Sequence, residues 1–311
     1  MSIGALILRR VLWTFPLIVF VTLATFALLR GAGGSPFEPP EGYGSLPETY
    51  ERYLRDFYHL DEPWLVEYAH YLWNVLTFDF GPSLVQRNLM VDDVIRHSFP
   101  VTLELVALAA AWAIPVGIAL GVYSATHRNR PLDYVLTTAA TTLLVVPVFF
   151  VAYLGGHYLV REWHVVPFGW DDRGTRAAAS LALALAPIGY IARLVRGAVV
   201  QTLEEDYVRT AAAKGLRPGR IVWIHVLRNS LTPFLSAAVP MLALLITGAF
   251  FVEDAFGIPG ASSFFAVAAR TRDYPLLMGL TVSLAAVMLV VNALADVLTA
   301  LLDPRLREQA R

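Results

Sequence analysis

The stretch "DYVRTAAAKGLRPGRIVWIHVLRNSLTP", residues 206–233, is polar and basic, yet it stands between two long apolar runs. Seven Arg or Lys residues fall between Arg193 and Arg228, and the acids among them are confined to residues 204–206. Short connections on the cytoplasmic side of membrane proteins carry such an excess of positive charge. The stretch therefore predicts a cytoplasmic loop between membrane-spanning segments.

The composition of the whole chain agrees with a membrane protein. Of its 311 residues, 57% are hydrophobic and only 16% are charged, which is outside the usual range for a soluble domain of this length. The chain has no cysteine, which excludes disulfides, thiolate metal sites and cysteine nucleophiles. The redox compartment is therefore not indicated by the sequence.

Apolar runs set the number of predicted spans, because a helix needs about 20 apolar residues to cross a bilayer. Six runs nearly free of charge lie at roughly residues 11–29, 100–124, 134–160, 177–195, 231–252 and 276–302. They are continuous, without the alternation of barrel strands. The first run, of 19 residues, is longer than the apolar part of a signal peptide and is expected to be retained. The sequence predicts an all-α membrane protein with six transmembrane helices.

The distribution of Lys and Arg predicts the orientation. With six spans, both termini, the loop at 125–133 and the basic region at 193–228 share one side, and this side holds 14 of the 24 Lys and Arg residues. Positive residues in short loops favour the cytoplasm. Both termini and the basic region are therefore expected to be cytoplasmic.

The sequence divides into an N-terminal helix at 1–30, a long extracytoplasmic segment at 31–99 and a membrane core at 100–311. The extracytoplasmic segment holds 11 acids between Glu38 and Asp93 and is too polar for a seventh span. Apolar residues at helical spacing predict two short helices near 50–58 and 65–72, lying against the membrane or packed as a small cap. Its aromatic residues fit either an interfacial belt or a docking surface for an outside partner.

The basic loop, residues 204–230, has the pattern of a helix, a sharp turn and a second helix. Alanines at 211–213 favour helix, and the acids at 204–206 complement its N-terminus. Gly215 suits a reversal that needs positive φ, and Pro218 suits the first turn of the next helix. We expect a short rigid lever rather than an active site.

A small face made by Ala211, Ala212 and Gly215 would let the backbone of another protein come close. The alternative is that the loop is an ordinary positively charged connection with no partner. Charge alone does not separate these two interpretations.

The loop resembles the coupling loop of permeases of ABC importers, the "EAA" loop that inserts into a groove on a cytoplasmic ATPase. Residues 209–211, Arg-Thr-Ala, stand where the general motif has Glu-Ala-Ala, and Gly215 stands at its glycine. The arginine is typical of the peptide-transporter branch. Arg228 replaces a later proline of the motif, so the end of the second coupling helix is left open. The resemblance assigns ATPase coupling to Asp206, Tyr207, Arg209, Thr210, Ala211, Ala212, Lys214, Gly215 and Leu216.

Other stretches extend the resemblance along nearly the whole chain. GGSPF, YHLDEPWLVEYAHYL, FDFGPS, SFPVTLEL, FFVEDAFGIPG and LLDPRLR are similar to the first permease subunit of oligopeptide and dipeptide importers. The family implies a multi-pass subunit of a prokaryotic plasma membrane that passes peptides inward by alternating access. It also implies four partners: a homologous second permease, two ATPase subunits that bind ATP and Mg²⁺, and an extracytoplasmic binding protein.

The residues of this chain predict no enzyme, cofactor or metal site of its own. The segment at 214–220 lacks the spacing and the hydroxyl of a Walker A loop. Ser262 falls short of a G-x-S-x-G elbow because Phe264 occupies the last place, and the seven histidines show no ligand spacing. Membrane lipid is an expected partner, and nucleic acid is not.

Helix breakers within the predicted spans are candidate pathway or kink residues. These are Pro115, Pro147, Pro187, Gly189, Pro240 and Gly248. Interrupted helices often line the pathway of transporters, whereas packing kinks and close-contact glycines are the alternative for each one. Glu104 and Asp296 lie near predicted span boundaries, and no buried carboxylate is evident near a span centre.

Other functions remain open beside a peptide permease. Within the same family the cargo could be nickel or another small solute. Outside the family, the chain could be an ion-driven secondary transporter, or a membrane scaffold without transport. The absence of evident central carboxylates counts against proton coupling.

Overall fold

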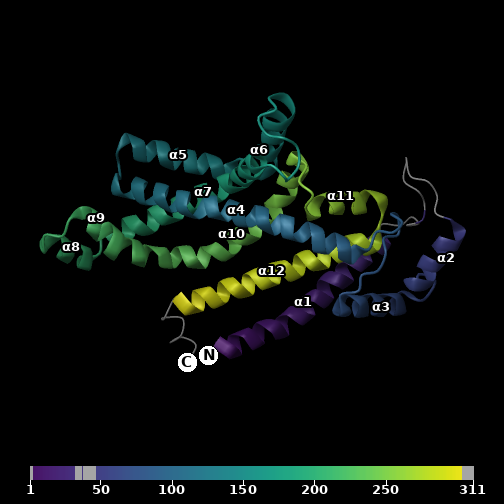
Figure 1. Ribbon diagram of the computed structural model, residues 1–311. Helices are drawn as coiled ribbons and strands as arrows, with labels where there is room; N and C mark the ends of the chain where they lie inside the picture. Colours follow the sequence, from purple (N-terminus) through teal and green to yellow (C-terminus); the bar gives the residue numbers. More distant parts are fainter. Residues whose placement is uncertain (1–2, 32–36, 38–46, 303–311) are drawn as a thin grey trace. The chain divides into compact units, whose positions relative to one another are not determined.

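The structure, a computed structural model, describes residues 3–31, 37 and 47–302 and is nearly all helical (Figure 1). Within these residues the β pairing is a single isolated bridge between Pro82 and Met90. Five of the six predicted apolar runs fall within single helices, and the run at 134–160 is interrupted at residues 146–147. The prediction of an all-α chain is confirmed.

Fourteen helical elements follow one another along the described chain. They are α1 (Ile3–Gly31), α2 (Glu48–Phe57), α3 (Trp64–Thr77), α4 (Val91–Thr126), α5 (Pro131–Val145), α6 (Val148–Gly155), the π-helix η1 (Gly156–Glu162), α7 (Arg173–Leu203), α8 (Asp206–Ala213), α9 (Pro218–Arg220), the π-helix η2 (Ile221–Val226), α10 (Leu227–Phe256), α11 (Ala261–Thr271) and α12 (Tyr274–Leu302).

Among the described residues, three helices are long and apolar enough to cross a membrane by length and composition: α4, α7 and residues 274–293 of α12. A fourth span results if α5 and the helix from Val148 to Glu162 are counted together. These two helices are bent by 91° at a short break, so the predicted span at 134–160 is not one straight helix. Pro147 stands at this break, and the residue before a proline is driven out of the helical region.

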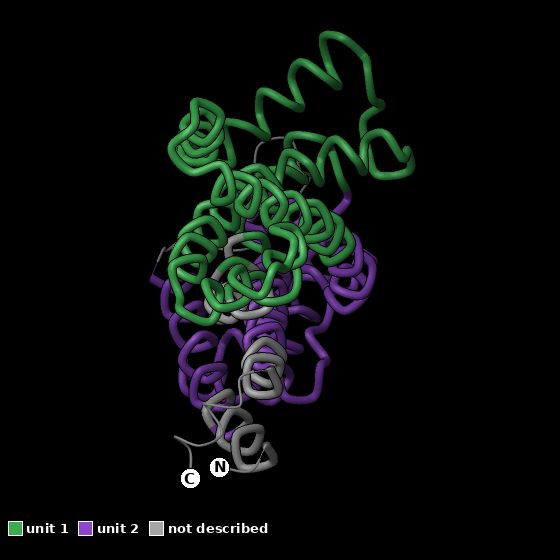
Figure 2. The backbone as a smooth tube through the Cα atoms, turned by 90° about the vertical axis from the view of Figure 1, so that its left-hand side faces the viewer, with its two compact units in different colours: residues 1, 103–258, 294–311 green, residues 2–102, 259–293 purple. Residues whose placement is uncertain are grey.

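The chain forms two compact units, shown in different colours in Figure 2. The first contains residues 103–258, and in it α7 packs against both α5 and α10. Gly189 of α7 allows the approach to α5, because a Cβ atom there would lie 2.4 Å from the carbonyl oxygen of Ala140. This is the close-contact role that small residues have between membrane helices.

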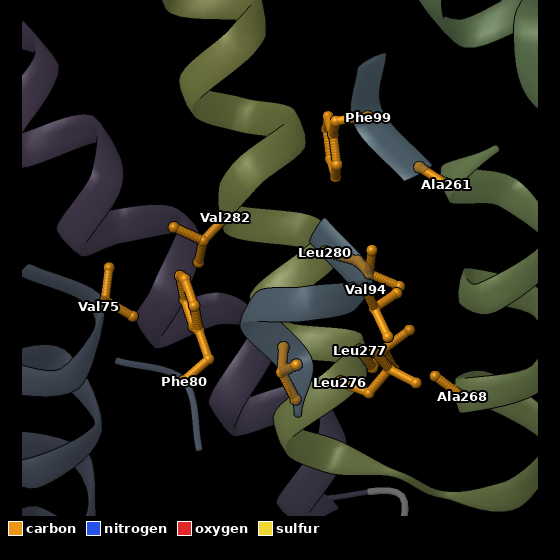
Figure 3. Packing of buried hydrophobic residues seen from close by; sticks show 11 residues of the cluster. Val75, Phe80, Val94, Phe99, Ala261, Ala268, Leu276, Leu277, Leu280 and Val282 are labelled. Atoms are coloured by element: carbon orange, nitrogen blue, oxygen red, sulfur yellow. The ribbon is translucent and has the colours of Figure 1, made fainter. Parts of the chain in front are cut away.

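The second unit contains residues 2–102 and 259–293. Its core joins the first turns of α4 to α11 and α12, and Val94 lies beside Leu277 and Leu280 (Figure 3). The cluster also includes Phe80, from the chain before α4, and Ala268 of α11. Each fully buried leucine of this kind contributes about 2 kcal/mol of apolar burial.

A polar contact holds the loop before α4 to the start of α12. The Ser83 hydroxyl donates a hydrogen bond to the Asp273 carboxylate, and the Leu84 N–H donates to the same carboxylate at 3.2 Å. Asp273 is 1% exposed, and burial raises the pKa of its carboxyl above the usual value.

The two short helices predicted after α1 are present as α2 and α3. Helix α3 packs against α1, and the Tyr68 hydroxyl donates to the Val19 carbonyl oxygen at 3.1 Å. Arg30 at the end of α1 forms an ion pair with Glu67 of α3. At least one aromatic residue of this segment therefore serves to attach it to α1.

Candidate functional site

The basic segment predicted to act as a lever, residues 204–230, begins directly after α7. Glu204 ends α7, and Glu205 has an extended backbone at the start of α8, with φ −70° and ψ 145°. Asp206 lies in the first turn of α8, where a negative charge favours the positive end of the helix dipole. The first predicted helix of this segment is therefore present over Asp206–Ala213.

The predicted reversal occurs at Gly215, whose φ is +78°. The Gly215 N–H donates to the Ala212 carbonyl at 2.9 Å and the Leu216 N–H to that of Ala211 at 3.4 Å, closing the end of α8. A Cβ atom at Gly215 would meet no other atom within 4 Å. The need for glycine there comes from the backbone conformation and not from crowding.

The sequence left the end of the second predicted helix open, and in the structure the helix continues past Pro233. Pro218 begins α9 as predicted, and helical structure then continues through η2 into α10, which runs to Phe256. Residues 220–232 contain neither glycine nor proline, so nothing in their backbone chemistry interrupts the helix. π-helical turns inside longer helices are frequent at functional sites.

Helix α8 uses one face for packing within the chain. Val208 and Ala211, one turn apart, are buried at 6% and 7% exposure, and α8 contacts η2. The methyl group of Ala211 is therefore covered by the chain itself, whereas the sequence placed it on an exposed small face. Ala212 and Gly215 are exposed, as expected.

The outward side of this segment combines basic and apolar side chains. We name it the coupling surface after the role that the sequence predicts for it, and define it as Tyr207, Arg209, Thr210, Ala212, Lys214, Gly215, Trp223 and Ile224, all exposed. Trp223 and Ile224 of η2, at 69% and 51% exposure, were not singled out in the sequence. The sequence feature that could have identified them is a tryptophan within a basic connection. Exposed large apolar residues that lie together mark interaction surfaces.

An ion pair between a buried carboxylate and a partly exposed arginine ties α5 to α7. Arg196 of α7 donates two hydrogen bonds of 2.8 Å to the two carboxylate oxygens of Asp133 on α5. Ser124 of α4 and the Asn129 N–H also donate to this carboxylate. Arg196 is therefore neutralised inside the unit, although the sequence grouped it with the cytoplasmic loop charges.

A second, exposed ion pair lies at the end of α7. Arg128, in the loop between α4 and α5, reaches Glu204 at 2.7 Å. The loop is thus joined to the C-terminal end of α7, two residues before α8 begins.

Three carboxylates are buried, although the sequence identified no buried carboxylate near a span centre. Asp133, Glu253 and Asp273 are all at most 2% exposed among the described residues. Asp133 and Asp273 have the partners described above, so these two are accounted for by structural contacts. Glu104 is exposed and pairs with Arg176 at 2.9 Å. The side chain of Asp296 lies outside the described residues.

Two of the predicted breakers lie at one apolar pocket. Pro147, at the bend between α5 and α6, and Pro187, inside α7, both line a pocket of about 230 Å³. Its lining residues are Leu144, Val146, Pro147, Val148, Leu183, Ala186, Pro187, Tyr190, Met241 and Leu245. The pocket therefore lies where the broken helix meets α7 and α10.

The other breakers do not end helices. Helix α4 continues through Pro115, as α7 does through Pro187. Gly248 is buried, and a Cβ atom there would lie 2.9 Å from Leu183 Cδ1, so its position resembles the close-contact role of Gly189. Pro240 lies within α10, and its side chain is outside the described residues.

Comparison with known proteins identifies the family. Residues 117–308 match the model of the family described as "Binding-protein-dependent transport system inner membrane component". The dipeptide transport system permease protein DppB of Bacillus subtilis is 36% identical over 93% of this chain and 94% of its own length. The oligopeptide transport system permease protein OppB of Haemophilus influenzae is 34% identical over 97% of this chain and 98% of its own length.

Solved structures share the fold. A chain of the MetNI methionine ABC transporter, in an inward-facing conformation, aligns with a TM-score of 0.54 and 17% identity over 68% of this chain and 96% of that chain. A chain of an amino acid ABC transporter aligns with a TM-score of 0.51 over 68% of this chain and 94% of that chain. The protein thus belongs to the family of binding-protein-dependent transport system inner membrane components.

Proposed function

We propose that this chain is a permease subunit of an ATP-driven importer of dipeptides or oligopeptides. The observation that carries the proposal is its similarity, over nearly the full length of both chains, to permeases named for dipeptide and oligopeptide transport. It works with a homologous second permease, two ATPase subunits and an extracytoplasmic binding protein. ATP and Mg²⁺ are bound by the ATPase subunits, and this chain is not itself an enzyme.

The coupling surface is the part of the chain that contacts the ATPase. Helix α8 is held on its inner face by Val208 and Ala211, and α7 is tied to its neighbours by Asp133 and Arg196. A short helix held in this way transmits a push better than a mobile loop does. Closure of the ATPase dimer moves α8, and the continuous helix from Pro218 to Phe256 passes the movement toward the membrane core.

The pocket at Pro147 and Pro187 is part of the translocation pathway. A broken helix leaves backbone groups without helical partners, and transporters place such breaks where they face a cavity. The pocket is lined mostly by aliphatic residues and one tyrosine, without charged groups. Such a lining suits a pathway that passes peptides of different sequence, because it has no charged group that would select one peptide side chain over another.

The chain crosses the membrane six times, with both termini and residues 204–230 in the cytoplasm. Residues 1–30 form the first span, residues 31–99 lie outside the cytoplasm, and residues 100–311 form the permease core. The support for this layout is that the six apolar runs are helical, apart from the break at residues 146–147, and that the loops are positively charged.

The test uses proteoliposomes that contain the four-subunit complex and its binding protein. ATP hydrolysis is measured with mixed peptides of two to about eight residues and, separately, with chelated nickel, since selectivity among solutes is not fixed by the fold. Stimulation by peptides is expected. Stimulation by nickel and by no peptide would overturn the cargo assignment, and transport without any ATPase subunit would overturn the coupling mechanism.

A further inference from the structure

Two histidines and a glutamate meet on the segment that joins α2 to α3. The ligand atoms of His59, Glu62 and His70 all lie within 4.8 Å of one another. The imidazole rings of His59 and His70 are stacked, with ring centroids 3.8 Å apart. His59 Nδ1 lies 2.9 Å from a carboxylate oxygen of Glu62. All three belong to the second compact unit.

The backbone holds two of these residues in place. His59 has φ +53°, and the Glu62 N–H donates to the His59 carbonyl oxygen at 3.1 Å, which closes a tight turn. Arg55 holds the neighbouring Asp61 in an ion pair at 3.1 Å. His59 and Glu62 therefore project from one ordered turn, and His70 approaches them from α3.

The hydrogen bond between His59 and Glu62 does not explain why His70 lies beside them. His70 stacks on His59, and two imidazoles with one carboxylate form a ligand set that divalent transition metals use in proteins. In tetrahedral geometry, ligand atoms about 2.0–2.1 Å from zinc lie about 3.4 Å apart. Because the stacked rings are nearly parallel, their nitrogen lone pairs do not point at a common ion, so metal binding requires the exposed His70 ring to rotate out of the stack. Glu62 is also exposed and can turn toward the same ion.

We propose that His59, Glu62 and His70 form a binding site for a divalent transition-metal ion, with Zn²⁺ as its representative. The three side chains fill three positions, and water completes the coordination. Oxygen-preferring cations such as Mg²⁺ and Ca²⁺ do not suit two imidazoles. The site is distinct from the transported cargo and needs neither the ATPase nor the binding protein.

A bound ion would cross-link the turn after α2 to α3, two elements otherwise joined by the short stretch between Glu62 and Trp64. Helix α3 is itself attached to α1 through Tyr68 and through the pair of Arg30 and Glu67. Metal binding therefore stabilises this part of the second unit. Sequence spacing did not reveal the site, because only the fold of the turn brings His59 to His70.

The test uses the full-length chain without a polyhistidine tag, in nanodiscs of a neutral lipid. The chain has no cysteine, so thiolates cannot contribute to binding. Zn²⁺ is titrated calorimetrically into the wild type and into His59→Asn, Glu62→Gln and His70→Gln. Asparagine is chosen at position 59 because it tolerates positive φ. The matched control is His157→Gln, since His157 lies 3.7 Å from Glu162 but is outside the three-residue cluster.

The expected result is one Zn²⁺ per chain, with affinity lowered at least about tenfold in each of the three variants and unchanged in the control. At one fixed Zn²⁺ concentration, the unfolding temperature should rise more for the wild type than for His70→Gln. The proposal is overturned if His59→Asn combined with His70→Gln binds Zn²⁺ as the wild type does. It is also overturned if His157→Gln loses as much affinity, or if Mg²⁺ binds equally well.

Discussion

At the scale of single residues, Gly215 is the position of residues 204–230 where the backbone most restricts the residue type, because its φ of +78° is unfavourable for most residues with a Cβ atom. We expect Gly215→Val to lower peptide uptake by the reconstituted complex while membrane insertion is retained. A β-branched residue in this conformation costs on the order of 1–3 kcal/mol. No atom lies within 4 Å of the added Cβ, so a clash does not contribute.

Two substitutions control for this prediction. Gly215→Asn should largely preserve uptake, since asparagine tolerates the left-handed region. Gly219→Ala adds a side chain four residues away, where space is also open and φ is not positive, and it should have no effect. Normal uptake and normal ATPase capture by Gly215→Val would mean that the segment is an ordinary cytoplasmic connection.

The pair formed by Asp133 and Arg196 should matter more for stability than the exposed pair beside it. Asp133→Ala leaves Arg196 without its partner, and because Arg196 is 28% exposed and can be hydrated, the loss should cost about 1–3 kcal/mol. Glu204→Ala breaks a pair whose side chains are 49% and 65% exposed, and it should cost under about 1 kcal/mol. Thermal unfolding in detergent compares the two variants, and equal shifts would contradict the assignment of a structural brace.

Asp273 should give the second unit a pH-dependent stability. Burial raises the pKa of this carboxyl above its unfolded value of about 3.9. Its protonated form is therefore favoured by folding, so its contribution is complete below the unfolded pKa and is lost as the pH rises through the folded pKa. The unfolding temperature of the wild type minus that of Asp273→Asn should fall as the pH is raised above about 4. A constant or rising difference would contradict this.

At the scale of elements, two neighbouring alanines of α8 should have different roles, one in packing within the chain and the other in contact with the ATPase. Ala211 is covered by the chain and Ala212 is exposed. Ala211→Leu should lower the unfolding temperature of the isolated chain, because overpacking costs about 1–3 kcal/mol. Ala212→Leu should leave that temperature unchanged and instead reduce ATPase capture by the complex. If both variants lose only ATPase capture, the inner face of α8 is not packed as described.

Local rules explain which elements the sequence predicted well. The start of α8, the reversal at Gly215 and the entry of Pro218 into the next helix each depend on residues within one turn. The break at Pro147 also follows a local rule, since proline acts on the residue before it. The angle of that break does not, because it depends on how α6 packs against α7 and α10.

Contacts between distant residues explain what the sequence missed. Asp133 and Arg196 are 63 positions apart, and their pairing depends on α5 and α7 lying side by side. The burial of Ala211 depends on η2, which begins ten residues later. In both cases the residue type was visible in the sequence, but its environment was set by tertiary packing.

At the scale of the whole molecule, the bent pair of α5 with α6 and η1 decides how the chain crosses the membrane. A pair bent by 91° can form either a broken span or a loop that returns to the side from which it entered. The two possibilities put residues 171 and 130 on opposite sides or on the same side. Positive charge at Arg128 and Arg130 favours a cytoplasmic position for the first end.

Cysteine labelling distinguishes these layouts, because the chain has no native cysteine to give background. Arg130 and Asp171 are exposed and suitable, whereas Asp172 caps α7 through hydrogen bonds to Gly174 and Thr175 and should be left intact. We expect an impermeant maleimide to label Asp171→Cys in intact cells, and Arg130→Cys only after the membrane is opened. Lys214→Cys, on the coupling surface, should behave as Arg130→Cys does. Labelling of positions 130 and 171 from the same side would make the bent pair a re-entrant loop, and labelling of position 214 in intact cells would reverse the orientation of the coupling surface.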